Sequence, residues 1–261
     1  MTESKMKVEY IDHMGNDLSI VRAATASFAK NPVEWDDEKH PRLINYLARG
    51  MTQADYDNMV EYLSGGQQTN SISRSPRLDK QNEVAEILEA YRHTATHWSP
   101  FAHTAITLRL KAPIAIHAQA MKHTVGYAHN TVSRRYVSDE PELFIPEFRL
   151  APEGSVKQGS GGIHPENALL QQAYETFCDM AIKLYLDMID KGVAPEQARF
   201  VLPQGVMTEW VSTGSLYAWA RFYNQRSDSH AQQEIQFLAQ EVDKIVGALF
   251  PVSWQALTGE Q

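Results

Sequence analysis

The stretch HTAITLRLKAP, residues 103–113, decides the fold class of this chain. Side chains along it alternate between two faces, which is typical of a β-strand with one face buried. Pro113 suits the first turn of a helix, because its φ angle is fixed near the helical value. The stretch therefore predicts a half-buried strand that leads into a helix. The face expected to point into the core carries Thr104, Ile106, Leu108 and Leu110.

Further strand and helix patterns lie on both sides of this strand. Residues 8–12 alternate as a short strand, and apolar residues at helical spacing follow over 18–28 and 43–50. Two longer amphipathic helices are expected in the last third of the chain, over 165–192 and 229–250. The order of these elements indicates an α+β (mixed α/β) protein with a central sheet flanked by helices and a helical C-terminal third.

The helix over 165–192 is predicted to bury an apolar stripe. Cys178 is the only cysteine and lies beside this stripe, so we interpret it as a small apolar filler rather than a nucleophile. A single cysteine also excludes an intramolecular disulfide and a cysteine-rich zinc site. The members of the predicted stripe are Leu169, Ala173, Phe177, Met180, Ala181 and Leu184.

Residues 51–95 have a different pattern from their surroundings. A helix that begins at Thr52 and ends before Gly65 is followed by a polar loop over 67–80 and by a second helical pattern. The sequence thus predicts a single domain over residues 1–261 with a helical hairpin inserted at 51–95.

Charge and composition exclude several classes of partner. The 261 residues have a formal net charge of −8, and electrostatic repulsion opposes binding to nucleic acid or to an anionic membrane. The N-terminal region lacks the apolar core of a signal peptide, and no apolar run approaches the roughly 18 residues of a membrane span. We therefore expect a soluble, cytoplasmic protein without nucleic-acid or membrane partners.

Common catalytic signatures are absent from the sequence, including the Walker-type phosphate loop, GxGxxG, HExxH and GxSxG. We interpret the glycine-rich loop over 159–162 as a surface loop. Several histidines between His97 and His129 recur about six residues apart, which points successive helical side chains in different directions. No metal site is expected from this spacing.

The positions of the arginines favour a site for an anionic ligand. Planar guanidinium groups bind phosphate through two parallel hydrogen bonds. Ion pairs at the surface are the alternative explanation, which composition alone favours. The arginines that lie beside Ser, Asn, Gln or aromatic residues are Arg134, Arg135, Arg199, Arg221 and Arg226.

Several segments, taken together, resemble the flavin-dependent thymidylate synthases. They occur in the family's order and cover nearly the whole chain, with 51–95 in place of a short connection. The matching segments are VEYIDHMGNDLSIVRAATASF (8–28), LINYLARG (43–50), HWSPFAH (97–103), LKAPIAIHAQAMKH (110–123), NTVSRRY (130–136), PEQARFVLPQG (195–205) and TGSLYAWARFYNQRSDSHAQQEI (213–235).

The resemblance implies two sets of site residues. Arg226 would be the catalytic residue that polarises uracil, and Arg135 and Arg199 would hold the phosphate. Residues that would bind dUMP are Gln119, Lys122, Ser133, Arg134, Arg135, Arg199 and Arg226. Residues that would bind FAD are His97, Ser99, Lys122, His123, Thr124, Asn130, Thr131, Ser215, Tyr217 and Arg221.

The resemblance also implies a reaction and an assembly. The protein would be a methyltransferase of nucleotide biosynthesis that converts dUMP into dTMP by reductive methylation. FAD would be the cofactor, NADPH the reductant and methylenetetrahydrofolate the one-carbon donor. The family uses no cysteine nucleophile, which agrees with the place of Cys178 within a helix. A homotetramer with active sites shared between chains is expected.

The chain departs from the family pattern at several positions, and two alternatives follow from this. One is the transfer of another one-carbon group to a pyrimidine deoxynucleotide, and the other is a non-catalytic role in nucleotide binding. The spacer from His123 to Ser133 is one residue longer than in the common form. Residues that replace the family's usual ones are Ala102, Ala118, Lys122, Thr124, Thr131 and Ser215.

Overall fold

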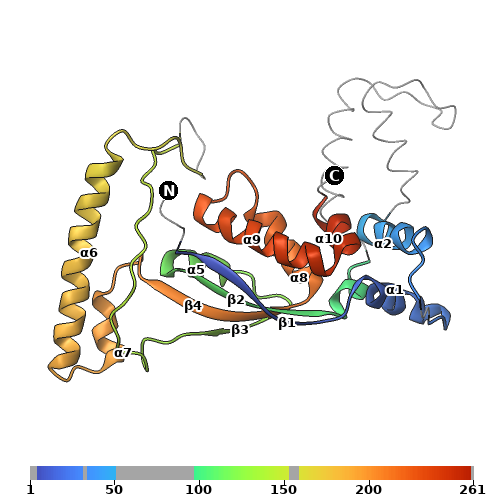
Figure 1. Ribbon diagram of the computed structural model, residues 1–261, viewed down its shortest axis with the longest axis horizontal. Helices are drawn as coiled ribbons and strands as arrows, with labels where there is room; N and C mark the ends of the chain where they lie inside the picture. The colour runs from blue at the N-terminus through green and yellow to red at the C-terminus, as the bar shows by residue number, and fades with distance from the viewer. Residues whose placement is uncertain (1–4, 32–33, 51–96, 153–158, 260–261) are drawn as a thin grey trace. The chain divides into compact units, whose positions relative to one another are not determined.

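The computed structural model describes residues 5–31, 34–50, 97–152 and 159–259 (Figure 1). The hairpin predicted at 51–95 lies outside these residues, so the single domain with an insertion stays a prediction. Four strands of the described chain form one sheet in the order β1-β2-β4-β3. They are β1 (Lys7–Met14), β2 (Ala105–Pro113), β3 (Tyr127–Thr131) and β4 (Met207–Gly214).

Strands β2 and β4 are antiparallel and lie at the centre of the sheet. At one end of the pair, Thr107 Oγ1 lies 2.9 Å from Thr213 Oγ1. At the other end, the N–H of Ile114 donates to the carbonyl oxygen of Val206 at 3.0 Å. The two partners thus run in opposite directions, and β3 joins the free side of β4.

The alternation predicted for β2 is confirmed. Ile106 and Leu108 are fully buried, and Leu110 is buried as well, whereas Arg109 between them is exposed. Pro113 ends the strand and is the N-cap of α5 (Ile114–Ala120), as its position in the sequence predicted.

The described chain forms two compact units. The first contains α5, α6 (Asn167–Asp190) and α7 (Pro195–Ala198), and the second contains α1 (Asp17–Thr25), α2 (Lys39–Arg49) and α10 (Pro251–Thr258). Helices α8 (Leu216–Arg226) and α9 (Gln233–Leu249) have residues in both. None of the helices in the described residues is both long enough and apolar enough to cross a membrane. The described residues of the first unit fall within Met1–Asp12, Thr107–Thr213 and Gln225–Val242. Those of the second unit fall within His13–Ile106, Gly214–Asn224 and Asp243–Gln261.

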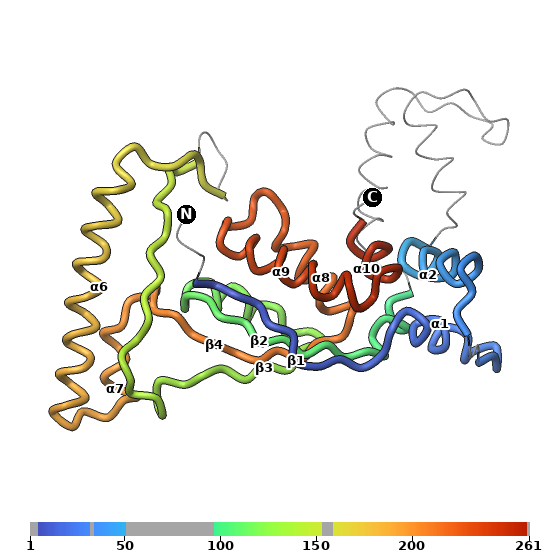
Figure 2. Tube along the Cα trace, in the orientation of Figure 1, coloured from blue at the N-terminus to red at the C-terminus, as the bar shows by residue number. Residues whose placement is uncertain are grey.

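In the first unit, an extended segment, residues 137–150, runs beside helix α6 (Figure 2). The hydroxyl of Tyr185 donates to the carbonyl oxygen of Val137 at 3.4 Å, and Gln171 Nε2 donates to that of Pro146 at 2.9 Å. These bonds fix the side of α6 that is covered.

The prediction that α6 buries the apolar stripe containing Leu169 and Phe177 is wrong. Phe177 is 60% exposed and Leu169 is 62% exposed, whereas Cys178 and Tyr185 are fully buried. The helix has two apolar faces, and the segment 137–150 covers the one that carries Cys178 and Tyr185. Burial raises the pKa of the Cys178 thiol, which keeps it protonated at neutral pH. We call the exposed set the α6 apolar face; its members are Leu169, Ala173, Phe177, Met180 and Leu184.

In the second unit, α1 begins at a capping box. The N–H of Ser19 donates to Asn16 Oδ1, and the N–H of Asn16 donates to Ser19 Oγ, both at 3.1 Å. The next residue, Asp17, is buried, and its carboxylate accepts from the N–H groups of Val252 at 3.0 Å and Ser253 at 2.8 Å. The first turn of α10 is thereby satisfied by a side chain of α1.

Candidate functional site

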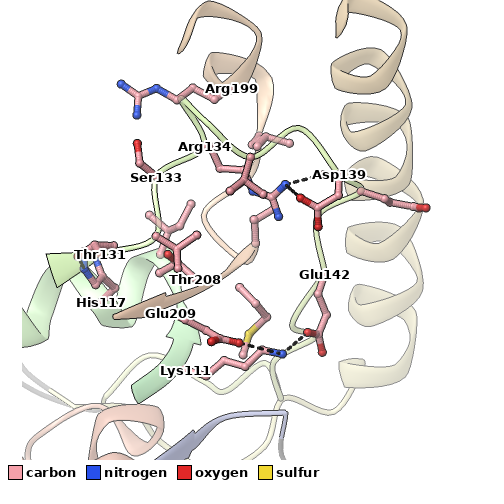
Figure 3. Close-up of a pocket in the computed structure, with 17 residues that line it drawn as sticks. Lys111, His117, Thr131, Ser133, Arg134, Asp139, Glu142, Arg199, Thr208 and Glu209 are labelled. Atoms are coloured by element: carbon pink, nitrogen blue, oxygen red, sulfur yellow. Dashed lines mark hydrogen bonds and ion pairs between the residues drawn. The ribbon is translucent and has the colours of Figure 1, made fainter. Parts of the chain in front are cut away.

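A cavity of about 790 Å³ lies beside the end of β3 in the first unit (Figure 3). Three of the residues expected to bind nucleotide, Ser133, Arg134 and Arg199, line it together. Basic and acidic side chains from other segments also line the cavity. The polar residues that matter for its chemistry are Lys111, His117, Thr131, Ser133, Arg134, Glu142, Arg199 and Glu209.

The backbone turns directly after β3, and this turn presents Ser133 and Arg134 to the cavity. The N–H of Val132 donates to the carbonyl oxygen of Glu209 at 2.8 Å, which continues the pairing of β3 with β4. One residue later the chain folds back, and the N–H of Tyr136 donates to the carbonyl oxygen of Ser133 at 3.0 Å. The end of a paired strand thus holds the Ser-Arg pair in place.

The three arginines near this turn have different partners. Arg134 is 18% exposed and donates from Nη1 to the carbonyl oxygen of Asp139 at 2.5 Å. Arg135 does not line the cavity, and its Nε lies 3.5 Å from a carboxylate oxygen of Glu196. Arg199 donates from Nε to the carbonyl oxygen of Glu196 at 3.2 Å. Figure 3 shows Arg199 and Ser133 on one side of the cavity, with Arg134 turned toward Asp139.

The cavity is also lined by a cluster of charged residues, Lys111, Glu142 and Glu209, which we did not assign to the site from the sequence. Lys111 makes a close ion pair with Glu142, and its Nζ lies 3.9 Å from Glu209 Oε1. Lys5 adds a second cation 3.8 Å from Glu142. The alternation of β2 places Lys111 on the polar face of that strand, so the sequence was enough to predict which face of the sheet carries this side chain. Glu142 gives no such signal, because it lies in an irregular extended segment.

The wall of the cavity carries His117 and Thr131, which are joined by a bond of 3.0 Å between His117 Nε2 and Thr131 Oγ1. The imidazole packs edge-on against Trp210, with ring centroids 4.9 Å apart. Burial lowers the pKa of His117, and the nearby His129 lowers it further, so the neutral form is favoured. Thr131, expected beside a flavin, therefore has a protein partner, while the neighbouring Asn130 is exposed.

A second group of the expected residues, also in the first unit, is centred on Arg226. Its Nε donates to His123 Nε2 at 2.9 Å, and its Nη2 donates to the carbonyl oxygen of Gln119 at 3.2 Å. Burial lowers the pKa of Arg226, but a guanidinium stays charged at neutral pH. Lys122 and Thr124 are exposed in the turn that follows α5.

The remaining expected residues form a third group, which lies in the second unit. His97 stacks on Tyr46 with centroids 5.6 Å apart, and the guanidinium of Arg221 lies 6.0 Å above the ring centre of Tyr217. Ser215 Oγ accepts from the N–H of Ala218 at 3.2 Å, so this side chain caps the start of α8.

One aromatic residue of the third group was not assigned from the sequence. Trp98 is 53% exposed and stacks on Tyr217 with ring centroids 5.9 Å apart. It precedes Ser99, which begins a short 3-10 helix, Ser99–Ala102, that buries Pro100 and Phe101. In the part of the chain that the structure describes, no group of three or more His, Cys, Asp or Glu side chains is placed to hold a metal ion.

Comparisons with known proteins agree on the family. The family model described as thymidylate synthase complementing protein matches residues 9–252. A flavin-dependent thymidylate synthase of Thermotoga neapolitana is 30% identical over an alignment of 255 residues, and the match covers 95% of this chain and 89% of the relative. One from Pseudothermotoga lettingae is 25% identical over 249 residues, 95% of this chain and 88% of the relative.

A solved structure supports the fold. The crystal structure of a UMP/dUMP methylase, PolB, from Streptomyces cacaoi, bound with 5-Br dUMP, has a TM-score of 0.74 to this chain. The two are 23% identical, and the match covers 98% of this chain and 96% of that one. The mixed α/β fold expected from the sequence is thereby confirmed. With the family model matched over nearly its whole length, the chain belongs to the flavin-dependent thymidylate synthase family.

Proposed function

We propose that this protein is a flavin-dependent thymidylate synthase, which makes dTMP from dUMP by reductive methylation. Methylenetetrahydrofolate would donate the carbon, and NADPH would be the reductant. The observation that carries the proposal is the cavity lined by Ser133, Arg134 and Arg199 in a chain of this family. A guanidinium pair and a hydroxyl at the edge of a cavity suit the phosphate of a mononucleotide.

The volume of the cavity and an arginine near it support a nucleotide as its occupant. About 790 Å³ lies within the range of small-molecule sites. Arg135 and Glu196 form an ion pair whose side chains are about half exposed, and such pairs contribute little free energy. Arg135 can therefore leave Glu196 for a phosphate, and it would join Arg199 there.

Arg226 is the residue to which we assign activation of uracil. A cation that stays charged in a partly buried place stabilises negative charge that develops on a carbonyl oxygen during the reaction. His123 and the Gln119 carbonyl engage only some of its N–H groups, so others remain for a ligand. Cys178 is buried and protonated, which supports a route without thiolate attack on the ring.

The third group fits a flavin nucleotide. Trp98 and Tyr217 offer an aromatic surface to a flat ring, and Arg221 beside them offers a cation to a diphosphate. His97 and Ser99, in the same unit, would complete this contact. Bound FAD would supply the hydride that turns the transferred carbon into a methyl group.

We further propose that the protein works as a homotetramer with active sites shared between chains. The α6 apolar face supports this, because Leu169, Phe177 and Met180 each expose about 60% of their surface. The lining of the cavity also lacks Gln119 and Arg226 of the same chain. A second copy that brought these residues to the cavity would complete the substrate site.

Release of tritium from C5-labelled dUMP tests the proposal, with FAD, NADPH and methylenetetrahydrofolate present and each omitted in turn. We expect tritium release together with dTMP, identified by mass, and no product without flavin or folate. A product of another mass would favour the transfer of a different one-carbon group. Binding of dUMP without flavin uptake or turnover would overturn the enzyme and favour a nucleotide-binding role.

UMP in place of dUMP adds a second arm to this assay. The structural neighbour is described as a methylase of both UMP and dUMP, although the likeness at 23% identity extends to the fold alone. Preference for dUMP is the expected result. Faster turnover of UMP would instead make the ribonucleotide the substrate of this chain.

A further inference from the structure

His129 on β3 joins the sheet to the turn that carries His123. Its Nδ1 lies 2.8 Å from Ser212 Oγ on β4, and Ser212 is buried. Its Nε2 lies 3.0 Å from the carbonyl oxygen of His123. Tyr127 stacks on the imidazole, with ring centroids 5.2 Å apart and the planes 17° from parallel. The ring is therefore held on one face and at both nitrogens.

The hydrogen bonds define which atoms carry protons. A carbonyl oxygen only accepts, so His129 Nε2 carries a proton and donates to it. Arg226 Nε only donates, so His123 Nε2 is unprotonated and accepts from it. His123 is therefore neutral with its proton on Nδ1. The bond from His129 exists whether or not His129 itself is charged, because Nε2 is protonated in both forms.

The turn between α5 and β3 is partly exposed. On the near side, the N–H of His123 donates to the carbonyl oxygen of Ala120 at 3.1 Å. Beyond it, Thr124 and Val125 are exposed, and Gly126 takes a φ of 81°. The longer spacer before Ser133 lies in this region.

We propose that His129 is a positioning residue for Arg226, acting through His123. This inference rests on the proposed function, in which Arg226 activates uracil. The contacts that act on Arg226 run from His129 Nε2 to the backbone of His123, and from the His123 side chain to Arg226. Loss of the bond at Nε2 lets the turn move, and Arg226 then loses the acceptor that orients its guanidinium.

Two amide substitutions separate the bonds at the two nitrogens of His129. In His129→Gln the amide reaches the place of Nε2, so it keeps a donor for the His123 carbonyl. In His129→Asn the amide reaches only the place of Nδ1, so it keeps the contact with Ser212 and loses the other. Ser212→Ala is the converse control, since it removes the Ser212 hydroxyl and leaves the Nε2 bond.

The first measurement is steady-state kinetics with dUMP. We expect His129→Asn to lower kcat by about tenfold, the effect of losing one hydrogen bond, with the KM for dUMP changed by less than about threefold. His129→Gln and Ser212→Ala should keep most of kcat. A positioning role for His129 is refuted if Asn and Gln lower kcat equally, or if neither does.

The second measurement does not depend on turnover. Nitrogen-15 NMR of labelled histidine side chains reports the tautomer of His123 in each protein. We expect the Nδ1–H form in the wild type and in His129→Gln, and a mixture of tautomers in His129→Asn. An Nε2–H tautomer in the wild type, or an unchanged spectrum in His129→Asn, overturns the inference. A wild type that makes no dTMP but gives the expected spectra overturns only the proposed function.

Discussion

The hydroxyl of Tyr174 on α6 occupies the space that a side chain at Gly205 would need. A Cβ atom placed on Gly205 would lie 1.8 Å from the Tyr174 oxygen and 3.1 Å from the carbonyl oxygen of Phe144. Only a residue without a side chain allows this approach. The contact fixes α6 against the turn that leads into β4.

Gly205→Ala should therefore destabilise the protein by about 1–3 kcal/mol, the usual cost of overpacking. Thermal or denaturant unfolding measures this free energy. Gly162→Ala is the matched control, because nothing lies within 4 Å of a Cβ there. Tyr174→Phe removes the clashing oxygen, so the double variant should recover part of the loss. Additive effects of the two substitutions would show that the clash is not the cause.

Phe177→Glu should weaken the assembly of the protein. A carboxylate in the middle of the α6 apolar face would be buried without a partner if a second copy covers that face. Sedimentation velocity should then show smaller species at micromolar concentration. Gln172→Glu adds the same charge to a polar side of the helix and should leave the assembly as it is. Equal sedimentation of all three proteins would mean that another surface makes the contacts.

His117 should make the protein less stable in acid. The folded protein holds the pKa of this group below its ordinary value of 6.5, mainly through burial. As the pH falls below 6.5, His117 takes up a proton in the unfolded chain before it does so in the folded protein. The free energy of unfolding therefore decreases between pH 6.5 and the lower pKa of the folded state. Denaturant unfolding between about pH 7 and pH 5 measures the slope. His117→Gln removes this titration and should flatten it, whereas an identical slope would contradict the assignment.

Arg226→Ala should lower kcat for dUMP by about a hundredfold to a thousandfold, as expected when a group that stabilises developing charge is removed. Arg226→Lys keeps the charge without the planar fork, so it should recover part of the rate. Tritium release measures both variants, and calorimetry with dUMP shows whether binding persists. Full activity in Arg226→Ala would remove this residue from the mechanism.

Regular patterns with one apolar face were readable from the sequence. The strand around Leu108 and the helix around Val242 have the expected burial, because each has one apolar face. Strand β4 was not predicted, since two of its buried positions are Ser212 and Gly214, which break the apolar alternation. The sequence did not predict which face of α6 is buried. Two faces of this helix are apolar, and the irregular segment 137–150 covers only one of them.

For the candidate site, the sequence supplied residues but not their grouping. Ser133 and Arg199 come from segments 66 positions apart, and only the fold places both in one cavity. The role of Glu142 depends on a long-range pairing with Lys111 that no local spacing encodes. In the sequence, His129 is only one of several regularly spaced histidines. Its contacts with Ser212 and His123 form only when the chain folds, so no local pattern predicts them.

The bond between Asp17 and the start of α10 also sets an order of events during synthesis. Asp17 is made early, yet both of its backbone partners, Val252 and Ser253, are made near the end of the 261 residues. The second unit is built from both regions, so its core cannot close while the later one is still inside the ribosome. The apolar face of an early helix such as α1 therefore stays uncovered until residues 252 and 253 have left the ribosome.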